Sequence, residues 1–181
     1  VELEKFPRGP DLLLLPPHAD VVFVAREWAE PSGFATAEAT LRGVCALRGV
    51  SAGTLIVCAW GSSGASAMVA PPAPAGGAVA LERACAEAEV LSSPAFPPAE
   101  LRDTTGAGDT FIAGMVHTLG DWHGRVWARD GTLEARWREE GGGAARVARA
   151  LEHACRLAGR KCGVHGFAGI VKQGEHGGKQ S

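Results

Sequence analysis

The 181-residue chain lacks several features that mark whole classes of protein. No apolar run approaches the roughly 18 residues that a membrane-spanning helix requires. The formal net charge is only −2, so we expect neither a general nucleic-acid binder nor a protein of the membrane surface. The chain begins with Val1 rather than Met and shows no charged-then-apolar targeting segment. We therefore expect residues to be missing before Val1.

The cysteines show no paired spacing. The five cysteines are an odd number, and no Cys-x-x-Cys occurs. This pattern argues against a disulfide framework or a zinc knuckle and favours a reducing, cytoplasmic compartment. Tyrosine is absent, whereas hydrophobic residues make up 46% and charged residues 21% of the chain. That balance is ordinary for a soluble globular protein with a real core.

Strand, helix and strand signals follow one another in the first third of the chain. Residues 20–25 form a continuous β-branched and aromatic run, which is typical of a strand buried on both faces of a parallel sheet. Residues 36–47 carry apolar side chains at helical spacing behind Thr36, a plausible N-cap. Residues 54–60 predict a second buried strand. This order predicts a βαβ unit and an α/β fold.

The rest of the chain alternates strong and weak signals. Residues 70–77 contain only Pro, Ala and Gly and predict a surface loop, whereas residues 78–91 fit either a helix or a segment that ends in a strand. From Asp103 the apolar stripe Phe111, Ile112, Met115, Val116 and Leu119 predicts a helix. We interpret residues 121–143 as an inserted excursion, and residues 144–162 as a last amphipathic helix.

Residues 103–110, Asp-Thr-Thr-Gly-Ala-Gly-Asp-Thr, carry the chemistry. Glycines at 106 and 108 allow a tight turn with no Cβ to block a ligand. Because the first N–H groups of a helix have no intrahelical partners, the turn can bind an anion such as a transferring phosphoryl group. Asp109 would face that anion, and a carboxylate there has a use if it accepts the proton of an attacking hydroxyl. The plainer alternative is an ordinary loop with a first-turn Asp that complements the helix dipole.

This string resembles the C-terminal signature of the ribokinase-like (PfkB) carbohydrate kinases. Further stretches resemble, in the same order, the branch of that family that phosphorylates fructose: residues 19–25, 32–34, 57–60, 95–98 and 159–171. The resemblance covers most of residues 19–171, with apparent insertions near 70–91 and 120–143. It implies an α/β fold of three layers (αβα), present as its C-terminal half without the N-terminal part and the β-sheet lid. Residues 1–172 would be this partial domain and residues 173–181 a flexible tail.

The resemblance also implies roles for individual residues. Asp109 would be the general base that contacts the sugar hydroxyl, and an anion hole would be formed by Gly106, Ala107 and Gly108 with the Asp109 N–H. ATP would further contact the turn Gly61, Ser62, Ser63 and Gly64, although a capped turn explains these residues equally well. Gly159 and Cys162 would flank the adenine, with core packing as the alternative.

The implied cofactors are ATP, Mg²⁺ and K⁺. Glu27 would assist Mg²⁺, although the family's Asn-x-x-Glu motif lacks its Asn here, and Asp103 with Thr105 would hold the monovalent cation. The implied function is ATP-dependent phosphorylation of a sugar, fructose to fructose 1-phosphate, by a cytoplasmic homodimer without nucleic-acid or membrane partners. No segment supplies the sugar pocket or the lid, so a truncated, non-catalytic nucleotide-binding or interaction module stays as the alternative.

Overall fold

A five-stranded mixed sheet forms the centre of the molecule. The computed structural model describes residues 1–4, 13–47, 49–123 and 143–170. The strands lie in the order β1 (Glu2–Leu3), β2 (Val21–Ala25), β3 (Leu55–Ala59), β4 (Ala65–Val69) and β5 (Leu91–Ser93). Strands β1, β2 and β3 are parallel, whereas β4 runs antiparallel to both β3 and β5. The carboxyl ends of β2, β3 and β5 therefore meet at the same edge of the sheet.

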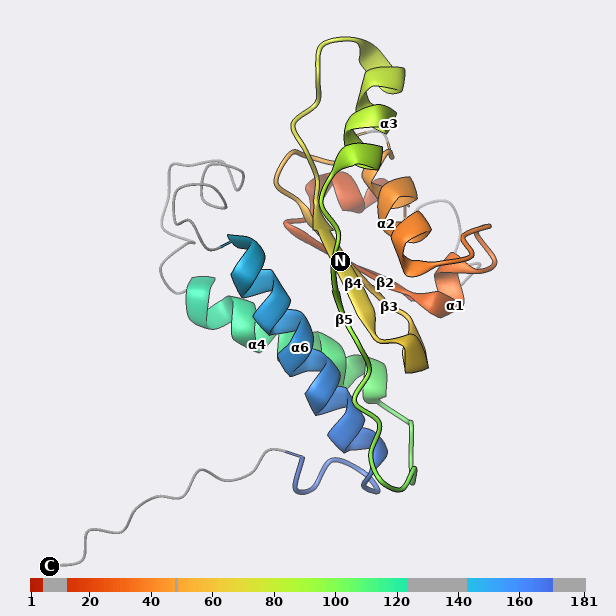
Figure 1. The fold of residues 1–181 in the computed structure, drawn as a ribbon, viewed down its shortest axis with the longest axis vertical. Coiled ribbons are helices and arrows are strands. Elements are labelled where there is room, and N and C mark those ends of the chain that lie inside the picture. Colours follow the sequence, from red (N-terminus) through yellow and green to blue (C-terminus); the bar gives the residue numbers. More distant parts are fainter. Residues whose placement is uncertain (5–12, 48, 124–142, 171–181) are drawn as a thin grey trace, which may run out of the picture.

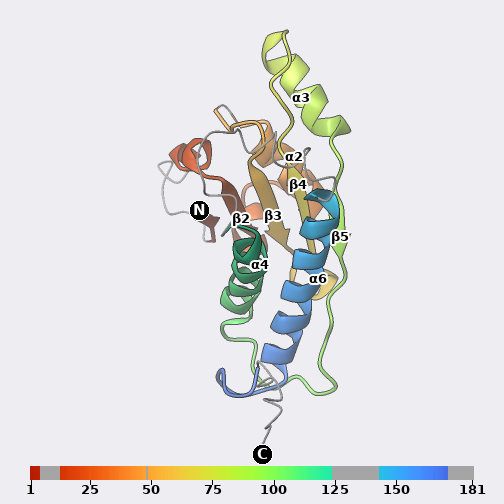
Figure 2. The same ribbon diagram turned by 90° about the vertical axis from the view of Figure 1, so that its left-hand side faces the viewer.

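Helices cover both faces of this sheet, as Figures 1 and 2 show. The helices are α1 (Arg26–Ala29), α2 (Ala37–Cys45), α3 (Gly77–Glu87), α4 (Ala107–His123) and α6 (Gly143–Cys162), with short 3-10 turns η2 (Pro16–His18) and η3 (Gly61–Ser63). Alternate residues of β2 enter separate cores: Val22 and Val24 pack with α2, and Phe23 packs with α4 and α6. The expected three-layer α/β architecture is confirmed.

Several helices and strands lie where the strongest sequence signals predicted them. Strands β2 and β3 occupy two predicted segments, and Thr36 caps α2 by accepting a 3.1 Å hydrogen bond from the N–H of Ala39. The predicted stripe of α4 was wrong at one residue, since the Val116 side chain is 54% exposed. Strand β4 was not predicted, because its small residues form a strand only by pairing with β3 and β5. The predicted excursion at residues 121–143 and the predicted tail fall mostly outside the described residues.

Residues 78–91 contain both elements that the sequence left as alternatives. Helix α3 ends at Glu87, and β5 begins four residues later at Leu91. The structure also corrects the expectation for cysteine, because Cys45 of α2 and Cys85 of α3 form a disulfide. Both cysteines are buried in the core on the face of the sheet that α2 covers. The odd total of cysteines and their irregular spacing gave no signal for this pair, which the fold brings together.

Helices α4 and α6 lie antiparallel on the other face of the sheet and approach each other closely (Figure 1). A Cβ at Gly114 would lie 3.0 Å from the Cα of Ala154, so small residues set this close approach. Because the helices are antiparallel, the N-terminal end of α4 lies beside the C-terminal end of α6. Among the helices of the described residues, none is both long and apolar enough to cross a membrane.

Candidate active site

The carboxyl edge of the sheet is where the predicted functional segments gather. The strand registers place Ala25, Ala59, Ala65 and Ser93 in one row across β2, β3, β4 and β5. The chain leaves this row toward α1, the η3 turn and the segment that leads to α4. In Figures 1 and 2 the η3 turn and the N-terminal end of α4 lie at the same end of the molecule. This edge is where open α/β sheets bind ligands.

The turn before α4 has a defined geometry. Asp103 Oδ1 accepts a 2.9 Å hydrogen bond from the N–H of Thr105, which closes an Asx turn. Gly106 follows with φ +76°, and a Cβ there would lie 2.6 Å from Cζ of Phe167. Gly106 is therefore required both for its left-handed backbone and for the close approach of the Phe167 ring.

Gly108 has a different reason to be glycine. Its φ is not in the left-handed region, because it lies in the first turn of α4, so a side chain at Gly108 would cause no backbone strain. A Cβ at Gly108 would meet no heavy atom within 4 Å, and the residue is exposed. The space in front of this amide is open, as a bound anion would require.

Backbone donors at the start of α4 remain available. The N–H of Ala107 donates to the carbonyl of Thr104 at 3.1 Å, and the N–H of Thr110 donates to the carbonyl of Gly106 at 2.9 Å. Within the described part of the chain, the N–H groups of Gly106, Gly108 and Asp109 have no acceptor. Three of the four amides assigned to the anion hole are therefore free, and that of Ala107 is engaged in a turn.

Asp109 is exposed in the first turn of α4. Its carboxylate makes no hydrogen bond or ion pair with any other described residue. By contrast, the neighbouring hydroxyl of Thr110 donates to the carbonyl of Gly106 at 2.7 Å and is buried. Of the two side chains, Asp109 is thus free to contact a substrate, while Thr110 closes the turn.

Lys161 is the residue of this site that the sequence reading missed. Its side chain is fully buried, and Nζ lies 2.9 Å from Oδ2 of Asp103. Hydrogen bonding from Lys161, and then from the Thr105 N–H, holds the pKa of the Asp103 carboxyl well below its usual range. A signal was present, because Lys161 continues the spacing of Leu151, Ala154 and Ala158 along the apolar stripe of α6.

This ion pair bears on the monovalent cation expected at Asp103. The Lys161 ammonium contacts Oδ2 and also the main-chain carbonyl of Asp103, at 3.2 Å, while Oδ1 is taken by Thr105. The oxygens that would bind K⁺ already have a cationic donor. Residues 103–105, as the structure has them, do not fit a monovalent cation.

Glu27 does not belong to a ligand cluster. It lies exposed on α1, two residues after the end of β2. Among the described residues, no group of three His, Cys, Asp or Glu side chains could hold a metal ion. The described residues therefore do not form a Mg²⁺ site by themselves.

The turn between β3 and β4 is explained largely by its own backbone. Gly61 and Gly64 have φ +56° and +94°, and the N–H of Trp60 donates to the carbonyl of Gly64 at 2.8 Å. A Cβ at Gly64 would lie 2.1 Å from the Ser93 carbonyl oxygen, so Gly64 is needed for packing against β5. Ser62 and Ser63 are exposed and leave their hydroxyls available.

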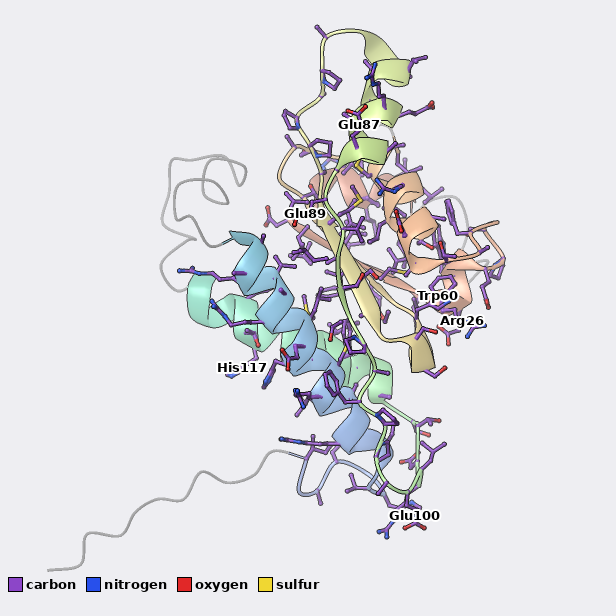
Figure 3. The ribbon with its side chains drawn as sticks, in the orientation of Figure 1. Arg26, Trp60, Glu87, Glu89, Glu100 and His117 are labelled. Atoms are coloured by element: carbon purple, nitrogen blue, oxygen red, sulfur yellow. A yellow bond between two sulfur atoms is a disulfide. The ribbon has the colours of Figure 1, made fainter. Side chains whose placement is uncertain are left out.

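Neighbouring side chains join the loops that follow β2 and β3. The Arg26 guanidinium lies 5.7 Å from the centre of the Trp60 ring, a cation–π contact. Figure 3 shows both residues at the end of the sheet where η3 lies. The contact ties α1 to the turn that the sequence assigned to ATP.

The C-terminal part of α6 packs against the segment that follows β5. A Cβ at Gly159 would lie 1.8 Å from the carbonyl oxygen of Phe96, so packing explains this glycine. The carbonyl of Cys162 accepts hydrogen bonds from the N–H groups of Arg102 and Asp103, at 2.8 and 3.2 Å. Both residues assigned to adenine thus hold the segment that leads to α4, and their contact with a nucleotide stays a prediction.

Comparison with known proteins identifies the family. The sequence pattern that defines the pfkB family carbohydrate kinases matches residues 10–166. The chain belongs to this family. It is 34% identical to ketohexokinase from Mus musculus over 171 residues, which are 94% of this chain and 43% of that protein. The expected family is thereby confirmed.

Solved structures agree on the fold. Ribokinase from Giardia lamblia matches with a TM-score of 0.61 and 17% identity, over 94% of this chain and 46% of that one. Fructokinase from Vibrio cholerae O395, solved with fructose, ADP and calcium ion, matches with a TM-score of 0.53 and 21% identity, over 88% and 40%. The chain therefore spans less than half the length of each of these three relatives.

Proposed function

We propose that the complete protein transfers the γ-phosphate of ATP to a sugar hydroxyl, and that the sugar is fructose, phosphorylated on its 1-hydroxyl. The observation that carries this proposal is the start of α4, where an exposed carboxylate at Asp109 adjoins free amides at Gly106 and Gly108. Family membership supports a kinase, and the mouse ketohexokinase relative supports fructose.

In the proposed mechanism the amides of Gly106, Gly108 and Asp109 bind the phosphoryl oxygens. The sugar hydroxyl attacks the γ-phosphorus, a new O–P bond forms, and the bond to the bridging oxygen of ADP breaks. Asp109 orients the hydroxyl and accepts its proton. A first-turn Asp is a weak base, which is sufficient when proton transfer comes late in a loose transition state. Mg²⁺ bound with the nucleotide would neutralise phosphate charge.

The proposal also assigns roles to the other predicted site residues. The Ser62 and Ser63 hydroxyls contact ribose or phosphate, and the C-terminal part of α6 near Cys162 lies beside the adenine. In this proposal residues 1–172 belong to one partial kinase domain and residues 173–181 are its tail. The complete protein is a homodimer in the cytoplasm. Alkylating free thiols in intact cells before lysis tests that compartment, because a reducing environment would keep Cys45 and Cys85 as thiols, whereas an oxidising one would preserve the disulfide of the structure.

A coupled assay for ADP release tests the function. With Mg·ATP we expect the complete protein to release ADP when fructose is added and less with ribose, and phosphorus–proton coupling in the product should identify the 1-position. We expect residues 1–181 alone to bind ATP weakly and to phosphorylate no sugar, because no described segment orients the sugar or excludes water. Tight ATP binding by the complete protein without ADP release with any sugar would favour the non-catalytic module.

A further inference from the structure

Lys161 carries the charge with the least access to water among the described residues. Its side chain is fully buried, whereas both neighbours, Arg160 and Cys162, keep some exposure. An ammonium is costly to bury unless it is paired and hydrogen-bonded. Lys161 meets this condition through a single residue, Asp103, which lies 58 positions earlier in the chain.

The contacts of Lys161 lead directly to the proposed phosphate site. Its ammonium holds Asp103 through both the carboxylate and the main-chain carbonyl. The other carboxylate oxygen of Asp103 holds the N–H of Thr105, the residue before Gly106. The ammonium also lies 5.4 Å from the centre of the Phe167 ring, which in turn covers Gly106. One buried side chain thus fixes the turn from two directions.

Stability alone is a weak reason for such a pair. Replacing a buried ion pair with apolar residues of similar volume is often neutral or stabilising, because the cost of desolvating two charges offsets their attraction. What an apolar pair could not supply is the direction of the Asp103 carboxylate. The direction of the carboxylate decides that the amide of Thr105 is used within the turn and that the amides of Gly106, Gly108 and Asp109 remain for a ligand.

We propose that Lys161 is a positioning residue of the phosphate site: it orients Asp103, and through Asp103 the Thr105–Gly106 turn, so that the amides of Gly106, Gly108 and Asp109 face an incoming phosphate. This inference rests on the proposed function, since it assigns the ligand of the turn as the phosphates of ATP. It adds a residue that touches neither substrate but controls the geometry of the groups that do.

Two variants of the complete protein separate positioning from stability. Lys161→Met leaves the partly exposed Asp103 without its cation, and we expect both the melting temperature and the affinity for ATP to fall, the affinity at least tenfold. Lys161→Met combined with Asp103→Leu removes both charges, so we expect the melting temperature to recover. The affinity for ATP, measured by titration calorimetry, should stay low because the turn has lost its orientation. Arg160→Met, a neighbouring exposed position, is the matched control and should change neither quantity.

Chemical rescue tests the same site without relying on the double variant. Lys161→Ala leaves space for a small cation, and added methylammonium should restore ATP affinity several-fold, with no such effect on the unaltered protein. Recovery of ATP affinity in the double variant, or absence of rescue in a folded Lys161→Ala protein, would overturn the inference. Failure of the unaltered protein to bind ATP would instead overturn the proposed function.

Discussion

Two glycine-bearing turns at the carboxyl edge of the sheet look alike in sequence but differ in what the fold requires of them. In the turn of residues 61–64, the Gly64 amide and carbonyl are used within the hairpin, and β5 leaves no room for a side chain there. In the turn of residues 103–109, three amides have no acceptor among the described residues, and the space before Gly108 is open.

Glycine at a turn is therefore weak evidence for a ligand until its contacts are known. Gly64 and Gly106 are both glycine because of a positive φ and a close neighbour, and neither fact requires a substrate. Gly108 has no such internal reason, which makes it the more informative residue. The ion pair of Lys161 and Asp103 adds a second distinction, because among the described residues the later turn is held by the buried ammonium of Lys161 and the earlier turn by no buried charge.

The largest effect should come from the carboxylate of the later turn. Asp109→Asn keeps the shape of the side chain and removes the proton acceptor. We expect turnover of the complete protein to fall at least ~10²-fold, with little change in ATP affinity. Asp20→Asn is the matched control, since Asp20 is exposed and precedes β2 at the opposite edge of the sheet. Near-normal turnover in the Asp109 variant would remove Asp109 from the mechanism.

Two glycines of α4 should respond in opposite ways. Gly108→Ala adds a methyl group to the open space before the amides, and we expect ATP affinity to fall roughly tenfold as a hydrogen bond to phosphate, worth about 1.5–3 kcal/mol, is weakened. Its melting temperature should not fall, because Ala favours a helix over Gly. Gly114→Ala should instead lower the melting temperature, since its Cβ would press on Ala154, and should keep ATP affinity. Calorimetry and thermal melts check both, and a Gly108→Ala protein with unchanged affinity would place the phosphate elsewhere.

The earlier turn should contribute less. Replacing both Ser62 and Ser63 with Ala removes two exposed hydroxyls, and a single hydrogen bond from one of them to the nucleotide is worth about 0.5–1.5 kcal/mol. We expect ATP affinity to fall by no more than about tenfold, with the melting temperature unchanged. Ser51→Ala, an exposed serine before β3, serves as the control. If the double serine variant lost as much turnover as we expect of Asp109→Asn, the ranking of the two turns would be reversed.

The smallest effect should be the loss of stability at acidic pH that follows from the ion pair of Asp103 with Lys161. The pKa of Asp103 is lowered in the folded protein, so its pairing contributes stability above the ordinary carboxyl pKa of about 3.9 and loses it as the pH falls through the lowered value. Carbon NMR should show Asp103 still ionised at a pH where ordinary carboxyl groups are already protonated. The Asp109→Asn variant helps to assign the carboxyl signals. In Lys161→Met, the pKa of Asp103 should move back toward its ordinary range. An Asp103 that titrates near 3.9 in the unaltered protein would contradict the pairing.

Much of the fold could be predicted because its signals are local. The β-branched run of β2, the Thr36 cap and the amphipathic stripe of α6 each act within a few residues of chain. The start of α4 was predicted for the same reason, since the glycines and the helix that follows them are adjacent. Strand β4 was missed, because Ala and Ser carry little strand preference and its pairing with β5 decides its conformation.

By itself, then, the sequence determined the α/β class, the family and the segment that carries Asp109, since these depend on residues close together in the chain. Only the tertiary structure decided which glycines serve packing, that Cys45 meets Cys85, and that Lys161 rather than a free cation holds Asp103. These facts join residues 40 and 58 positions apart. No pattern within a single helix or strand encodes such contacts, because they exist only once the antiparallel helices and the sheet have packed.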